Sequence, residues 1–128
     1  MYSLICSFIS FQTFFFYYLL FITIVDNQGD RDIYIKRYDI GPDVLVAVCD
    51  IELIGKHLEE GGLTLEVSES FYKGEAVTES EVVASLRQAT IANLVGERAV
   101  RCALANSFIE EANVIFIGGV PHAQMVRI

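Results

Sequence analysis

A run of apolar residues at positions 44–49 constrains the fold more than any other feature of this sequence. It reads Val-Leu-Val-Ala-Val-Cys and has no polar side, so a strand formed by it is buried on both faces and lies inside a sheet. Residues 32–38 alternate apolar and polar side chains, and the turn sequence Ile-Gly-Pro-Asp at 40–43 separates the two segments. Together these residues predict a β-hairpin whose second strand is central.

The residues after this hairpin predict a helical turn and a third strand. Asp50 follows the apolar run directly and is predicted to cap the helical turn. Residues 63–67 alternate strictly, which places Leu63, Leu65 and Val67 on one buried face of the sheet.

Two helices are predicted in the second half of the chain. The first begins at a capping box formed by Thr78 and Glu81, whose side chains satisfy free backbone N–H groups. The second begins at Asn93 and presents an apolar stripe to the core, formed by Leu94, Val95, Ala99, Cys102 and Ala103. Two strands around Gly118 and Gly119 close the chain. Strands and helices are segregated, so the predicted class is α+β: a mainly antiparallel sheet of about five strands with two helices on one face.

Residues 1–30 are predicted to lie outside this domain, which spans residues 31–128. Residues 4–25 carry no charge and are about as long as the 20 residues of a membrane-spanning helix. In one interpretation they are not part of the natural protein and arise from translation upstream of the true start. In the other they are a membrane anchor, and the basic residues that follow place the domain on the cytoplasmic side.

The charge of the chain argues against a broad nucleic-acid surface. The whole chain has a formal net charge of −8, and residues 31–128 contain 9 basic and 15 acidic side chains, so 9 − 15 = −6. Non-specific affinity for nucleic acid comes from lysine and arginine displacing counterions from phosphates. We therefore expect no DNA partner. No Walker loop, dinucleotide-binding glycine motif or nucleophile elbow is present in the sequence, and no cofactor is predicted.

The cysteines and histidines do not have the spacing of a metal site. Cys6, Cys49 and Cys102 are far apart and form no Cys-x-x-Cys pair, and His57 and His122 are 65 positions apart. The cysteines have apolar neighbours, which predicts buried, reduced thiols in a reducing compartment.

Four segments of the sequence resemble the small archaeal family called domain of unknown function 424: residues 46–50, 65–72, 89–100 and 117–124. The strings Asn-Leu-Val-Gly-Glu-Arg and Gly-Gly-Val-Pro-His-Ala-Gln carry the resemblance, which extends over about residues 33–128. The resemblance implies a cytoplasmic archaeal protein. The family has no assigned reaction, so it implies no catalytic residues.

Polar residues and glycines within two of these segments are the candidate binding residues. They are Asn93, Gly96, Glu97, Arg98, Gly118, Gly119, Pro121, His122 and Gln124. A helix start presents free N–H groups, and glycine lets a ligand approach the backbone. The alternative is a structural polar network that fixes a loop to a helix, with Glu97 paired to Arg101.

The first functional hypothesis is a non-catalytic binding module for RNA or for a component of the translation apparatus. It depends on cations at Lys36, Arg37 and Lys73 that lie close in the sequence to four aromatic residues, Tyr34, Tyr38, Phe71 and Tyr72. Proteins that bind single-stranded RNA stack its bases on aromatic side chains of this kind. The alternative is that these aromatic side chains belong to the core or to a sheet edge.

The second hypothesis is a small enzyme in which His122 acts as an acid or base. Histidine titrates near neutral pH, and a carboxylate that orients its ring is the usual partner. Glu97 and Glu69 are the candidates for that carboxylate.

Overall fold

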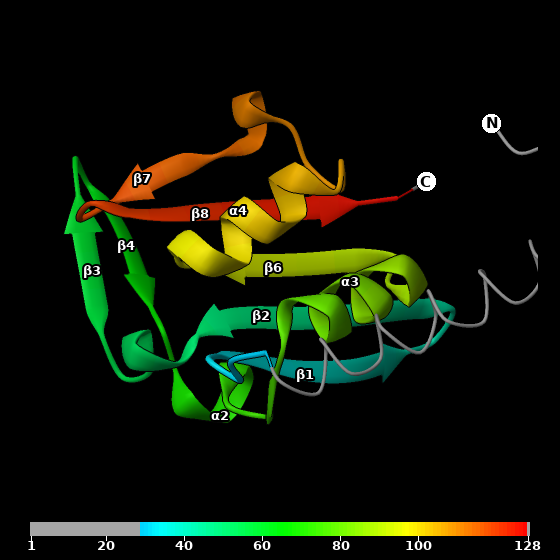
Figure 1. Ribbon diagram of the computed structural model, residues 1–128. Helices are drawn as coiled ribbons and strands as arrows, with labels where there is room; N and C mark the ends of the chain where they lie inside the picture. The colour runs from blue at the N-terminus through cyan, green and yellow to red at the C-terminus, as the bar shows by residue number, and fades with distance from the viewer. Residues whose placement is uncertain (1–28, 128) are drawn as a thin grey trace, which may run out of the picture.

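The computed structural model describes residues 29–127, which form a six-stranded sheet with two helices on one face (Figure 1). The strand order is β5-β1-β2-β6-β8-β7. In chain order the strands are β1 (Ile33–Ile40), β2 (Asp43–Asp50), β5 (Glu75–Val77), β6 (Ile91–Val95), β7 (Ile115–Ile117) and β8 (Val120–Val126). The predicted α+β class is confirmed.

The hairpin predicted around the apolar run is confirmed as β1 and β2. They pair antiparallel over their full length, from Ile33 opposite Asp50 to Ile40 opposite Asp43. The second strand is central, and residues 46–50 within it are buried.

The prediction of a mainly antiparallel sheet of about five strands was incomplete, because the sheet is mixed and has six strands. β2 and β6 run parallel, with Leu45 opposite Ile91 and Cys49 opposite Val95. A parallel pair needs a crossover connection, and here the chain crosses through a helix that covers one face. Thr90 fixes one end of the pair, since its hydroxyl donates to Asp43 at 3.1 Å and accepts from the N–H of Val44 at 2.9 Å.

The two helices on one face are α3 (Glu79–Gln88) and α4 (Glu97–Ala105), as predicted (Figure 1). They pack on the side chains of alternate strand residues, among them Val46, Val48 and Leu94. From the helices, Val82, Leu86, Ala99 and Cys102 complete this core.

Within residues 29–127, the opposite face is covered at one end only. There α2 (Glu69–Tyr72) and a separate hairpin of β3 (His57–Glu60) and β4 (Leu63–Glu66) pack over Ala47, Cys49 and Val95. The prediction that Leu63 lies on a buried face of the main sheet was wrong, since Leu63 is 52% exposed and β4 pairs with β3 alone. Two short 3-10 helices, η1 (Ile51–Leu53) and η2 (Glu111–Asn113), complete the described chain.

The predicted helix start at Asn93 was wrong, because Asn93 lies in the middle of β6. Leu94 and Val95 are buried as expected, but on opposite faces of a strand, in the two separate cores. The helix begins after Gly96, whose φ of 111° is not helical. Leu94 and Val95 are spaced from the later apolar residues as if all of them lay on one face of a helix, although the strand ends and the helix begins between them.

The glycine pair forms a tight hairpin turn. Gly118 and Gly119 have φ of 59° and 80°, which favours glycine at both positions of a two-residue turn between β7 and β8. The predicted loop around them is therefore shorter than expected. His122 and Gln124 belong to β8.

The capping box at the start of α3 is confirmed. The N–H of Glu81 donates to the Thr78 hydroxyl at 3.3 Å, and the N–H of Thr78 donates to Glu81 Oε1 at 3.0 Å.

Replacing Thr78 with alanine is expected to lower the free energy of unfolding by about 1 kcal/mol, because the N–H of Glu81 loses its partner at a position only 3% exposed. Thr78→Ser keeps the hydroxyl and is the matched control. Urea denaturation measures both, and equal losses in the two variants would show that the cap does not contribute.

The two described cysteines are buried and free, as predicted. Burial raises the pKa of the Cys49 thiol to about 12 and that of Cys102 to about 11, so neither is a thiolate at neutral pH. The predictions for residues 1–30, including the membrane segment 4–25, fall almost entirely outside the described residues. Within residues 29–127, none of the helices has the length and apolar character needed to cross a bilayer.

Candidate functional site

The sheet separates the predicted site residues into two groups. Asn93, His122 and Gln124 alternate with the strand residues that pack under the helices, and so lie on the opposite face, called the outer face here. Gly96, Glu97 and Arg98 lie at the start of α4. The remaining residues, Gly118, Gly119 and Pro121, form the β7–β8 turn and the buried start of β8.

His122 is half-buried on the outer face and is oriented by the backbone. Its Nδ1 lies 2.9 Å from the carbonyl oxygen of Leu94. A carbonyl only accepts hydrogen bonds, so the neutral ring carries its proton on Nδ1, and Nε2 is left as an acceptor. The side chain lines a cavity of about 500 Å³ at the edge of β8.

Asn93 and Gln124 form a cross-strand pair on the same face. They are directly opposite in the β6–β8 ladder, and Gln124 Nε2 donates to Asn93 Oδ1 at 2.9 Å. Ile91 and Val126 are the next pair of these strands on the outer face. We call the five residues Ile91, Asn93, His122, Gln124 and Val126 the β6–β8 surface.

The structure does not bring His122 together with either predicted carboxylate. Glu97 is exposed at the start of α4 and lines a different cavity, of about 340 Å³, with Gly119 and Pro121. Glu69 lies on α2, where its carboxylate is 3.2 Å from Lys73 Nζ. Among the described hydrogen bonds, the only partner of the His122 ring is the Leu94 carbonyl.

The second group, at the start of α4, is held in place by Asp50. The sequence predicted Asp50 as the cap of a different element, the helical turn that directly follows it. Its carboxylate accepts from the backbone N–H groups of Arg98 at 3.0 Å and Ala99 at 2.9 Å. Asp50 therefore caps α4, not the neighbouring 3-10 turn, where it makes no side-chain cap. It is 2% exposed, and burial raises the pKa of its carboxyl above the ordinary 3.8, although both N–H groups oppose this shift. The one available signal in the sequence was an acidic residue at the end of a buried strand.

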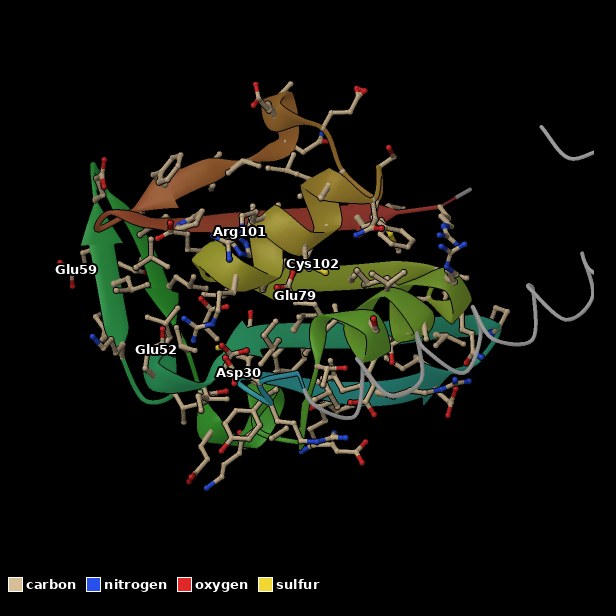
Figure 2. The ribbon with its side chains drawn as sticks, in the orientation of Figure 1. Asp30, Glu52, Glu59, Glu79, Arg101 and Cys102 are labelled. Atoms are coloured by element: carbon tan, nitrogen blue, oxygen red, sulfur yellow. The ribbon has the colours of Figure 1, made fainter. Side chains whose placement is uncertain are left out.

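Arg98 is neutralised by carboxylates. It forms ion pairs with Glu52 and with Asp32, whose Oδ2 lies 3.0 Å from the Arg98 Nε. That Nε is buried and its N–H does not point at an acceptor, so its contact with the Asp32 carboxylate is electrostatic. The Arg98 Nη2 donates to the backbone carbonyl of Asp32 at 3.3 Å. Beside Arg98, a cavity of about 400 Å³ is lined by Arg101 of α4 and Glu79 of α3, both seen in Figure 2. Its lining mixes both charges and does not form an anion site.

Comparison with known proteins agrees with the segments singled out in the sequence. Residues 38–128 match the model of the family described as "Protein of unknown function (DUF424)". The chain belongs to the DUF424 family. Both strings that carried the resemblance lie in the matched region, in β6–α4 and in the β7–β8 hairpin. The family match does not assign an activity to these residues.

A solved structure has a similar fold. The chain resembles the crystal structure of an uncharacterized conserved protein from Methanopyrus kandleri, with a TM-score of 0.64 and 29% sequence identity. The match covers 73% of this chain and 89% of the other. No curated protein matches this chain.

Proposed function

We propose that this DUF424 protein is a non-catalytic binding module and that the β6–β8 surface is its contact site. One observation carries the proposal: the outer face of the sheet is covered at one end and left open at the other. At the covered end Ala47, Cys49 and Val95 are completely buried, whereas Val126 is 65% exposed and Gln124 is also at the surface. The open end therefore presents an apolar side chain, Val126, beside the polar groups of Asn93, His122 and Gln124, a combination that a protein contact can use.

The chemistry of this surface supports binding over catalysis. Asn93 and Gln124 supply amide groups, and His122 supplies one ring nitrogen with a fixed role. Acid–base catalysis by His122 with Glu97 or Glu69 is the alternative, and it needs a carboxylate within hydrogen-bonding distance of the ring. A backbone carbonyl occupies that position instead.

The sequence predicts RNA or a component of the translation apparatus as the partner, and a cytoplasmic archaeal protein. The aromatic residues that suggested RNA pack α2 onto the sheet: Tyr38 stacks on Phe71 with ring centroids 5.2 Å apart, and Tyr72 is 4% exposed. Lys36 donates to the carbonyl of Ser70, and Lys73 pairs with Glu69. These contacts, with a net charge of −8, favour a protein component over RNA.

Val126→Arg is expected to reduce partner recovery about tenfold or more, because a charge then replaces the most exposed apolar contact of the surface. The tagged full chain is used to recover partners from an extract of its native host, with and without ribonuclease. Ile40→Arg is the matched control, because Ile40 is 57% exposed and lies on β1, separated from β8 by two strands.

Recovery that survives ribonuclease and depends on Val126 identifies a protein partner, and recovery lost with ribonuclease identifies RNA. Equal recovery by the two variants, or the absence of any Val126-dependent partner, would overturn the proposal.

A further inference from the structure

The outer edge of β8 contains a stretch of unpaired backbone. β7 pairs with β8 only from Ile117 opposite Val120 to Ile115 opposite His122. β8 continues to Val126, where β6 is its only strand partner in the described chain. The last part of β8 is therefore a free sheet edge.

The hydrogen bonds between β8 and β6 show which backbone N–H and C=O groups of β8 point away from β6. The Pro121 carbonyl accepts from Gly96, and the Arg127 N–H donates to Thr90, so the odd-numbered residues of β8 face β6. N–H and C=O groups alternate sides along an antiparallel strand. Those of Gln124 and Val126 therefore point away from β6, and no backbone partner for them occurs within residues 29–127.

A groove runs along this free edge. The cavity of about 500 Å³ is lined by residues 122–126, which belong to both faces of β8 in turn, so it follows the edge of the strand. Across from them it is lined by Phe108, Ile109 and Asn113 from the chain between α4 and β7, and by Ile115 of β7. Figure 1 shows this connection, with η2, standing away from the C-terminal half of β8.

The edge lacks the features that usually prevent strand pairing. Free edges are commonly protected by lysine, by proline or by a bulge. The outward-facing positions hold Gln124 and Val126, and the register of β8 against β6 is continuous from His122 to Val126. A regular edge with no charged side chain at these outward-facing positions, beside a groove lined by both polar and apolar residues, is suited to adding a strand.

We infer that the free edge of β8 binds an extended peptide segment of a protein partner as an additional β-strand. Its backbone groups would pair with those of Gln124 and Val126, and alternate side chains would pack on Phe108 and Ile109. The net charge of −8 favours a segment with basic flanks. This inference rests on the proposed function, because His122, Gln124 and Val126 line the groove as well as the β6–β8 surface.

The test uses a phage-displayed library of random peptides about twelve residues long, selected on the full chain. We expect enriched peptides with alternating apolar residues and basic flanks. Gln124→Pro removes the outward N–H without breaking the ladder to β6, and a sheet edge tolerates proline. It should weaken binding of the enriched peptides at least about tenfold. Gln124→Ala is the matched control, since it keeps the N–H and loses only the side chain.

Hydrogen exchange measured by NMR on the wild-type chain tests the same point without a substitution. The amides of Gln124 and Val126 should exchange quickly in the free protein and be protected at least about tenfold with an enriched peptide. The amides of Ala123 and Met125 face β6 and are the internal reference.

Each outcome separates the inference from the proposed function. Strand addition would be overturned if the enriched peptides bound the Gln124→Pro variant with the same affinity as the wild-type chain and gave no new protection from hydrogen exchange at Gln124 and Val126. If such peptides still lose affinity for Val126→Arg, the β6–β8 surface remains a binding site. Failure to enrich any peptide would also overturn the inference, whereas the recovery experiment with Val126→Arg decides the proposed function independently.

Discussion

Gly96→Ala is expected to lower the free energy of unfolding by about 4 kcal/mol, for two reasons. The first cause is the backbone: a φ of 111° with ψ of 157° is a region that residues with a Cβ rarely adopt. The second is space, because an added Cβ would lie 2.4 Å from Asp50 Cγ and 2.7 Å from both carboxylate oxygens. Asp50 is held by two N–H groups and cannot move aside without uncapping α4.

Gly62→Ala separates these two causes. Gly62 has φ of 85°, but nothing lies within 4 Å of the position of an added Cβ, so only the backbone cost of about 1–2 kcal/mol applies. Urea denaturation of the two variants gives the difference. Gly96→Ala should also cost less when Asp50 is already alanine, because the clashing carboxylate is gone. Equal losses for Gly96→Ala and Gly62→Ala would contradict the proposed clash.

Asp50→Ala is expected to lower the free energy of unfolding by about 3 kcal/mol. The N–H groups of Arg98 and Ala99 would lose a charged acceptor at a site that is closed to water. Glu52→Ala is the matched control, because it removes a carboxylate from the same arginine at an exposed position and should cost less than about 1 kcal/mol. Chemical denaturation at neutral pH measures both variants, and similar losses would show that Asp50 acts only as another charge near Arg98.

The pH dependence of this effect has a defined sign. The pKa of Asp50 is raised by burial, so the native state binds this proton more tightly than the unfolded chain does. Its contribution to stability is therefore largest below the ordinary pKa of 3.8 and decreases as pH rises through the raised value. The difference between wild type and Asp50→Ala should grow as pH falls from 7 toward about 4. Glu81 has a pKa that is lowered mainly by the Thr78 N–H, but it is present in both proteins. Its contribution to the pH dependence therefore cancels in the difference between them. A difference that shrinks in acid would contradict this assignment.

Local sequence signals predicted those parts of the fold that local interactions determine. The β1–β2 hairpin follows from alternation, a continuous apolar run and turn residues, and the start of α3 follows from Thr78 and Glu81. The strand β6 was missed because a short apolar segment such as residues 91–95 is compatible with helix or strand. What decides in favour of a strand is pairing with β2 on one side and β8 on the other, and neither partner is near in sequence.

The candidate site shows the same limit. Asn93, His122 and Gln124 were selected from the two family-like strings, and the structure places all three together on one face. Asp50 was predicted to cap the adjacent turn, because the helix that it actually caps is distant in the chain: its contact with the Arg98 N–H joins residues 48 positions apart. The free edge of β8 leaves no local signal at all, since it depends on where β7 stops pairing.

The parallel seam between β2 and β6 has a consequence for the order of folding. Leu45 and Ile91 are neighbours across the seam but 91 − 45 = 46 residues apart in the chain, whereas β1–β2 and β7–β8 close through short turns. Closing a long loop has an entropic cost that must be met before its contacts contribute. Two side-chain hydrogen bonds near this parallel pair join Thr90 to Asp43 and Asp50 to the start of α4. Neither can form before the loop closes. We therefore expect the meeting of these two halves to limit the folding of the sheet, and the buried aspartate that caps α4 to act only once they have met.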